Sequence, residues 1–259
     1  MTNRKSIYLE CIGNGTIEEC LIAAKEAGFA AVELPTIEED KRAEVKALFE
    51  KYDMICPSIM TSGAWDNIAT SHDPEVRKKS AECYKRAVDT AVYMGCDTVL
   101  TVPGGVMPDI TYEEALVNAK LTLSEVVPYA AERGITLAIE NVWNKFLLTP
   151  ADMAAFIDSF ESDYVKAYFD IGNVVIYAYP QHWIKTLGKR IKRVHIKGFV
   201  LHGFDSFEWC SLLKSGIDWK AVMDELNATG YNGWVTAELG PDERGLSGIT
   251  EDMDKILAL

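Results

Sequence analysis

One unit recurs along this chain of 259 residues: a helical segment rich in alanine and charged residues, then a glycine, then a short apolar run. It occurs as AAKEAGFAAVEL, AVYMGCDTVLTV, AAERGITLAIE and LNATGYNGWVTAEL, with Gly28, Gly95, Gly134 and Gly230 at the junctions. A glycine directly after a helix is expected, because the chain there often adopts a left-handed conformation that a side chain disfavours. The recurring unit therefore predicts helices that alternate with strands.

The apolar, β-branched runs between these helices predict eight strands, at residues 6–10, 30–34, 54–60, 97–102, 135–141, 165–171, 193–198 and 233–239. Strands that alternate with helices form a parallel sheet, and eight such units in about 250 residues have the size of a (β/α)8 barrel. An open, doubly wound sheet is less favoured, because the first strand-to-helix turn, ECIGNGTIEE, lacks GxGxxG. We therefore expect an α/β fold in which residues 1–259 form a single TIM barrel domain.

Composition excludes several classes of partner. The formal net charge of −13 opposes binding to nucleic acid and to anionic membrane surfaces, which attract Lys and Arg. No run approaches the roughly 20 apolar residues of a membrane span, and the N-terminus has no apolar signal region. The six cysteines form no CxxC pair, which suits reduced thiols. We expect a cytoplasmic protein, and a homo-oligomer is left open.

Four polar residues lie at the ends of successive predicted strands. Glu140 and Asp170 end the fifth and sixth strands, His195 lies on the seventh, and Glu238 ends the eighth. In a barrel these positions line the active site. Each residue is set in an apolar run, where a buried carboxylate is costly unless it is paired or bound to a cation. Three carboxylates and one imidazole suit one divalent metal ion, Mn²⁺, Mg²⁺ or Co²⁺, and are also compatible with Zn²⁺.

Each of these residues, taken singly, also has a structural explanation. A glutamate at a strand end is often an ion-pair partner or a helix cap, and His195, between Arg193 and Lys197, could be a core histidine. All four occupy the same depth on successive strands. That coincidence favours the metal site.

Five segments resemble a known family: ENVWNKFLLTP, YFDIGN, KRVHIKGF, SGIDWKAVM and GWVTAEL. They are similar to the xylose isomerase-like TIM barrel superfamily, in particular its sugar and sugar-phosphate isomerase/epimerase branch, which includes D-tagatose 3-epimerase, hydroxypyruvate isomerase and inosose dehydratase. The resemblance covers nearly the whole chain and is strongest from 135 to 239. It implies that Glu140, Asp170, His195 and Glu238 bind one divalent metal, and that Glu140 and Glu238 are the acid/base catalysts.

Two departures from the family pattern concern the substrate. Related epimerases commonly have a histidine three residues after the strand-6 aspartate, whereas this chain has Asn173, which cannot carry a proton at neutral pH. They also place an arginine in the loop after strand 7, whereas residues 198–216, expected to be an irregular loop here, contain none. The substrate is therefore expected to be anchored differently.

Further residues near the predicted strand ends are candidates for substrate binding. Alternation along the strand directs Lys197 to the same face as His195, where it would contact a substrate oxygen or, equally well, pair with Glu238. Trp209 is expected to pack within its own loop. The predicted substrate-binding residues are Glu33, Trp65, Asn141, Trp143, Asn173 and Lys197.

The predicted function is that of a metal-dependent isomerase or epimerase with a small-molecule carbohydrate substrate. A metal-stabilised enediolate would form from a ketose or a related small polyhydroxy ketone when the proton next to the carbonyl leaves. The loops after the predicted strands 7 and 8 contain few cations that could bind a phosphate. We therefore expect a neutral sugar to be accepted at least as well as its phosphate. The alternatives are a dehydratase like inosose dehydratase, a metallonuclease of the endonuclease IV type and a non-catalytic sugar-binding barrel. The small number of histidines, four, and the negative net charge disfavour the metallonuclease.

Overall fold

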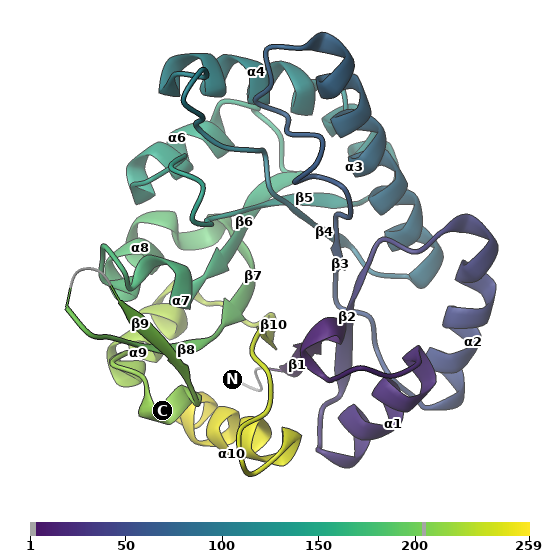
Figure 1. Ribbon diagram of the computed structural model, residues 1–259, viewed down its shortest axis with the longest axis vertical. Helices are drawn as coiled ribbons and strands as arrows, with labels where there is room; N and C mark the ends of the chain where they lie inside the picture. The colour runs from purple at the N-terminus through teal and green to yellow at the C-terminus, as the bar shows by residue number, and fades with distance from the viewer. Residues whose placement is uncertain (1–3, 204–205) are drawn as a thin grey trace.

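A computed structural model describes residues 4–203 and 206–259. Parallel strands close into a barrel in the order β1-β10-β7-β6-β5-β4-β3-β2, with helices around it (Figure 1). The predicted (β/α)8 barrel is confirmed. The barrel strands are β1 Arg4–Tyr8, β2 Ala31–Pro35, β3 Ile59–Met60, β4 Thr98–Thr101, β5 Thr136–Glu140, β6 Val165–Asp170, β7 Ile191–Ile196 and β10 Trp234–Ala237.

The helices begin and end where local chemistry predicts. Thr16 and Thr111 each form a capping box with the glutamate three residues later. Gly95 and Gly230 end their helices with φ of 79° and 77°, a left-handed conformation that favours glycine. The helices are α1 Ile17–Glu26, α2 Arg42–Lys51, α3 Pro74–Met94, α4 Tyr112–Ser124, α5 Val127–Glu132, α6 Pro150–Asp158, α7 Ile171–Val174, α8 Pro180–Leu187, α9 Trp219–Thr229 and α10 Leu246–Leu257.

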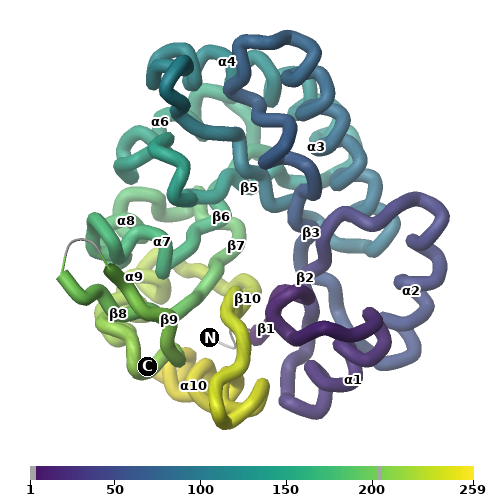
Figure 2. The backbone as a smooth tube through the Cα atoms, in the orientation of Figure 1, coloured from purple at the N-terminus to yellow at the C-terminus, as the bar shows by residue number. Residues whose placement is uncertain are grey.

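Closure of the barrel brings the two ends of the sequence together. The chain winds once around the barrel, so that β10 meets β1, with Arg4 opposite Trp234 (Figure 2). A large apolar core fills the space between strands and helices, and a small cluster that includes Leu100, Ala138 and Tyr168 lies apart from it.

Two segments differ from the sequence prediction. The third strand is shorter than the predicted 54–60, because Pro57 has no N–H to donate to a sheet ladder. The segment 198–216, expected to be an irregular loop, contains an antiparallel hairpin of β8 Gly198–Leu201 and β9 Phe207–Cys210. Gly198 allows the two strands to approach, since a Cβ there would lie 2.7 Å from the Cys210 carbonyl oxygen.

Two expectations from composition concern the chain as a whole. All six cysteines are free thiols, in agreement with the expectation of reduced cysteines. Among the described residues, none of the helices combines the length and the apolar character that crossing a membrane would require.

Candidate active site

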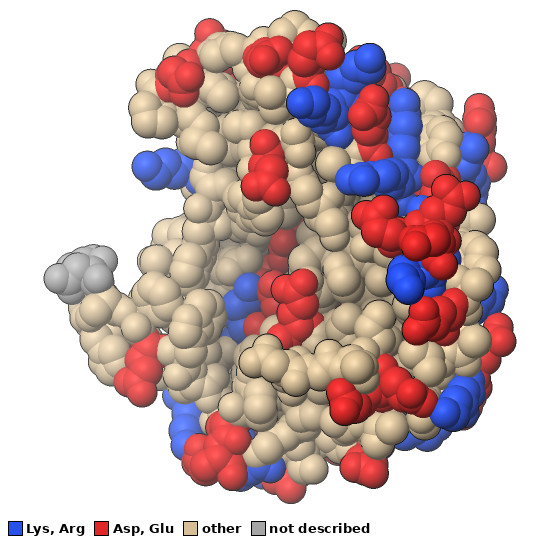
Figure 3. Space-filling view, turned by 45° about the vertical axis from the view of Figure 1, so that its right-hand side comes forward, with Lys and Arg blue, Asp and Glu red and all other residues tan. Residues whose placement is uncertain are grey.

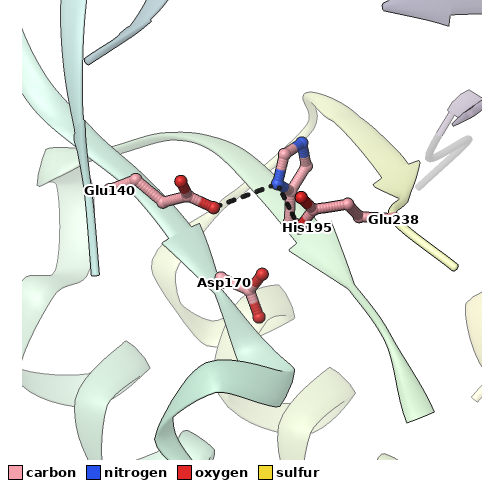
Figure 4. A group of neighbouring side chains, drawn as sticks. All are labelled: Glu140, Asp170, His195 and Glu238. Atoms are coloured by element: carbon pink, nitrogen blue, oxygen red, sulfur yellow. Dashed lines mark hydrogen bonds and ion pairs between the residues drawn. The ribbon is translucent and has the colours of Figure 1, made fainter. Parts of the chain in front are cut away.

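The four residues predicted as metal ligands lie together at the carboxyl end of the barrel. Glu140 ends β5, Asp170 ends β6, His195 lies on β7 and Glu238 directly follows β10. One side-chain ligand atom of each lies within 4.8 Å of the corresponding atoms of the other three. Figure 4 shows Glu140 and Glu238 approaching the His195 ring from different strands, with Asp170 beside them.

The donor set fits a divalent cation. Asp170 and His195 are fully buried, and the Glu238 side chain is 23% exposed. Asp170 Oδ2 and Glu238 Oε2 are buried oxygens without a hydrogen-bond partner among the described residues. The Lys197 ammonium lies within ion-pair distance of both, at 2.9 and 2.6 Å, but without the alignment of a hydrogen bond. Three carboxylates and an imidazole with free lone pairs are suitable ligands for such an ion.

The His195 ring is oriented by a carboxylate behind it. Its Nε2 lies 2.7 Å from Glu33 Oε2, and Glu33 in turn accepts hydrogen bonds from Ser58 Oγ and the Tyr168 hydroxyl. The Nδ1 atom then faces Glu140 and lies 3.2 Å from its Oε1. Metal-binding histidines are commonly oriented by such an outer carboxylate.

Glu33, predicted as a substrate contact, lies behind the His195 ring in the structure. Glu33 is fully buried and is not among the cavity-lining residues that the structure describes. Its strand-end position was recognised in the sequence, but its partner is the His195 ring, which lies between Glu33 and Glu140.

The two carboxylate oxygens of Asp170 have different partners, one in the backbone and one in the site. Oδ1 accepts the Asn173 backbone N–H at 2.8 Å and so caps α7, while Oδ2 faces Lys197. The side-chain amide of Asn141 accepts a hydrogen bond from the backbone N–H of Asp170 and donates one to its backbone carbonyl. The side-chain amide of Asn173 donates to the backbone carbonyl of Asn141. Asn141, predicted to bind substrate, is 1% exposed and instead ties β5 to β6.

Burial and neighbouring charges move the acidity of the carboxylates in opposite directions. Burial raises the pKa of Glu140 to about 7, with a further contribution from the Glu238 charge. Burial also raises the pKa of Asp170, against the opposing effect of Lys197. Burial would raise the pKa of Glu238 too, but His195 and Lys197 hold it well below its usual value. The two glutamates thus differ in proton affinity although both border the same site.

In the metal-free protein the surrounding acidic groups raise the pKa of the two basic groups of the site, His195 and Lys197. Burial would lower the pKa of His195, but Tyr168 and the carboxylates of Glu33, Glu238 and Glu140 raise it well above its ordinary value. Burial would also lower the pKa of Lys197, but the carboxylates of Asp170 and Glu238 outweigh that effect and raise it.

The Lys197 side chain can pack against residue 172 because that residue is a glycine. A Cβ at Gly172 would overlap Lys197 Cγ. Lys197 thereby reaches Glu238 on the neighbouring strand and borders the cavity described next.

A cavity of about 340 Å³ opens above the four residues. Glu140 and Glu238 lie on its wall, and the space-filling view shows acidic and basic side chains meeting in a central hollow (Figure 3). Four of the predicted substrate-binding residues line this cavity, namely Trp65, Trp143, Asn173 and Lys197.

Trp209, expected to pack within its loop, also borders the cavity. Its ring stacks on Trp143, with centroids 5.9 Å apart and an interplanar angle of 17°, and packs edge-on against Phe199. The hairpin that carries it projects from the body at the left of Figure 3. The strand alternation of 207–210 was the available signal for this placement.

A second cavity, of about 710 Å³, was not predicted from the sequence. It is bordered by Tyr8, Glu10 and Cys11 at the end of β1, and by Lys197 and Glu238 on the side of the first cavity. The signal was present, because Glu10 ends a predicted strand and barrel strands end at the active site.

These features together define a (β/α)8 barrel with a buried acidic site at the carboxyl ends of its strands. The chain belongs to the xylose isomerase-like TIM barrel family, whose model matches residues 21–258. The resemblance expected from the sequence is confirmed.

Individual relatives are more distant. The chain is 26% identical over 196 residues to a putative L-ribulose-5-phosphate 3-epimerase of Haemophilus influenzae, covering 71% of this chain and 68% of the relative. It is 21% identical over 258 residues to an inosose dehydratase of Geobacillus thermodenitrificans, covering 89% and 84%. A crystal structure of a D-tagatose 3-epimerase-like protein superposes with a TM-score of 0.85 at 22% identity, covering 98% of this chain and 97% of that one.

Proposed function

We propose that this protein is a divalent-metal-dependent isomerase or epimerase of ketoses or related small polyhydroxy ketones. The observation that carries the proposal is the position of the two glutamates. Glu140 and Glu238 are near enough to Asp170 and His195 to share one cation with them, and they also form part of the cavity wall. Groups placed in this way can hold an ion and exchange protons with a bound substrate.

The proposed chemistry is proton transfer next to a carbonyl. A divalent ion, when bound by the four residues, polarises the carbonyl and acidifies the neighbouring C–H. Glu140 and Glu238 come from β5 and β10, three positions apart in the barrel, so they reach the substrate from different sides. One carboxylate removes the proton and the other returns it, which inverts the carbon, while return by a single carboxylate to the adjacent carbon gives isomerisation.

Other cavity residues would bind and enclose the sugar. Lys197 can donate to a substrate oxygen once the ion shares its carboxylate partners, and Asn173 offers a hydrogen-bonding amide from α7. Trp65 and Trp143 would stack on the apolar face of the sugar and exclude water.

A neutral substrate is favoured over a phosphorylated one. Arg244, a candidate phosphate ligand, is bound by Asp242 and Asp252 at 2.6 and 2.8 Å. Lys214 pairs with Glu243. Both cations are therefore paired with carboxylates, and neither is among the described residues that line the first cavity, which supports a free sugar.

A dehydratase is the second candidate, since the inosose dehydratase relative matches 89% of this chain. Proton removal next to a carbonyl begins both reactions, and only the fate of the intermediate differs. Product analysis distinguishes them, because elimination of water gives an unsaturated product and epimerisation does not.

The decisive experiment is incubation of the Mn²⁺-loaded protein in D₂O with free and phosphorylated ketoses, followed by NMR. We expect deuterium at the carbon next to the carbonyl, and loss of exchange after dialysis against a chelator. Exchange that survives complete removal of the metal would contradict the proposed chemistry.

The metal site has a separate test in Asp170→Asn. The variant should bind metal more weakly, by at least the 10–100-fold typical of losing a residue behind a ligand, because one anionic donor is lost. The α7 cap should survive, since asparagine caps helices as well as aspartate. Equilibrium dialysis measures the metal, and Asp163→Asn, whose side chain is 99% exposed, is the matched control. A large fall in melting temperature of the metal-free variant would instead make Asp170 a structural residue.

A further inference from the structure

The first and second cavities adjoin at three residues. Lys197, Trp209 and Glu238 border both of them. The second is about twice as large, at 710 against 340 Å³, and each lies within the roughly 300–1,000 Å³ of small-molecule sites. The smaller cavity, which also contains Glu140, is the one in which proton transfer is proposed. The larger one extends away from that glutamate.

The position of the second cavity limits what can occupy it. It is bordered by the end of β1, by the hairpin at Trp209–Ser211 and by the loop Leu239–Asp242 after β10, and it is open to solvent. Glu140 is not among its described lining residues. Glu238 lies on the border of the two cavities, so a group that extends from it toward Glu10 would be attached to the part of the substrate that lies away from Glu140.

The charges of the second cavity disfavour a phosphate. Lys197 is the one basic residue among the described residues that line it, and its ammonium lies between Asp170 and Glu238. Glu10 and Asp242 contribute carboxylates to the same wall. An anion there would meet acidic residues, and the described cations nearest to it, Lys197 on the wall and Arg244 beside Asp242, are already paired with carboxylates.

The same lining is suited to a neutral polyhydroxylated group. Trp209 is 54% exposed on the shared border and offers an aromatic face for a sugar ring. The Glu10 carboxylate and the Ser211 hydroxyl can accept hydrogen bonds from sugar hydroxyls. Cys11 contributes a protonated thiol, because burial and the Glu238 charge raise its pKa to about 12.

We propose that the second cavity is a subsite for a neutral glycosyl unit, so that the substrate is a ketose or keto sugar carrying a second sugar through a glycosidic bond. This inference rests on the proposed function and specifies its substrate class. The ketose would lie between Glu140 and Glu238, and the attached sugar would pass Trp209 into the larger cavity.

The test compares three probes in the D₂O exchange assay: D-fructose, D-fructose 6-phosphate and 6-O-α-D-glucosyl-D-fructose, which leaves carbons 1–5 of the ketose free. We expect the disaccharide to exceed fructose in kcat/KM for exchange by about tenfold, equivalent to about 1.4 kcal/mol. The phosphate should not exceed fructose. Equal or lower kcat/KM for the disaccharide, with fructose active, would overturn this inference and leave the proposed function standing. Absence of exchange with every ketose would overturn both.

A substitution that fills the second cavity gives an independent readout. Gly240 lines it, has no positive φ, and has no atom within 4 Å of an added Cβ, so Gly240→Phe should fold. The ratio of disaccharide to fructose kcat/KM should fall about tenfold. Gly216→Phe, equally open but outside both cavities, is the matched control and should leave the ratio unchanged. Cys11→Trp fills the cavity from the opposite wall, and an unchanged ratio in both filling variants would contradict the subsite.

Discussion

A charged cluster lies at each end of β7, and the two clusters differ in how fully they are hydrogen-bonded. At the amino end, Arg193 donates to Asp97 Oδ1 at 2.5 Å, to the Pro57 carbonyl from two nitrogens and to the Lys192 carbonyl. At the carboxyl end, Lys197 faces Asp170 Oδ2 and Glu238 Oε2, which accept no hydrogen bond from the described residues. Arg193 within β7 thus takes part in a cluster with four hydrogen bonds, and Lys197, directly after β7, takes part in one whose carboxylates each keep an oxygen without a hydrogen bond.

This difference separates a structural cluster from a binding site. A largely buried charged group contributes to stability only when it is paired and hydrogen-bonded, and the Arg193 guanidinium donates four hydrogen bonds. Buried carboxylates left without hydrogen bonds are costly, and they persist where a ligand completes them. Substitutions at the amino end of β7 should therefore lower the free energy of unfolding, and substitutions at its carboxyl end should lower activity.

The largest effect is expected at the carboxyl end, from Glu140→Gln. Loss of the proposed base should slow ketose exchange in D₂O roughly 10³-fold, within the range for general acid–base groups. The melting temperature of the metal-free protein should not fall, because the amide removes a buried carboxylate whose pKa is raised by burial. Glu132→Gln, at a 77% exposed side chain, is the control. Exchange within tenfold of wild type would argue against Glu140 as a catalyst.

The next effect is expected at the amino end, from Arg193→Met. The variant should lose about 3 kcal/mol of unfolding free energy in urea, because Asp97 and the Pro57 carbonyl lose their buried partner. Metal content should be unchanged. Arg190→Met, which breaks a more exposed pair with Asp158, should cost about 1 kcal/mol or less. Equal losses in the two variants, or loss of metal from Arg193→Met, would contradict the division between the two ends.

The smallest effect is the pH dependence of the amino-end pair. Burial would raise the pKa of Asp97, but Arg193 and Lys192 lower it below its usual value. The stabilisation is therefore complete above the unfolded pKa of about 3.9 and is lost as the pH falls through the lower folded value. Because Asp97 is 52% exposed, we expect only about 1 kcal/mol between wild type and Asp97→Asn at pH 7.

Urea unfolding of both proteins between pH 7 and pH 2.5 measures this difference. It should shrink toward the acidic end. A difference that grows as the pH falls would mean that the pair does not lower the pKa of Asp97.

The parts of the fold that the sequence predicted were those set by local chemistry. Gly95 and Gly230 end helices because of their own backbone freedom. The hairpin was missed because its strands, Gly198–Leu201 and Phe207–Cys210, are stabilised by each other and by Trp143, which is distant in the sequence.

The same distinction explains the site. Strand ends place Glu140 and Asp170 at a common depth, so their proximity could be predicted. The strand-end rule does not say which polar atom a side chain contacts. Glu33 and Asn141 fulfil the rule, yet one bonds His195 and the other the backbone of Asp170. Those partners depend on the packing of neighbouring strands.

The close approach of Gly172 and Lys197 links two positions that are 25 residues apart in the chain. A methyl group at 172 and a long side chain at 197 cannot occupy the same space. Across related sequences the two positions should therefore vary together, with alanine or larger at 172 accompanied by a shorter or redirected side chain at 197. An engineer who introduces Gly172→Ala to stiffen the turn after β6 would displace the Lys197 ammonium from the site, and would need to redesign both residues together.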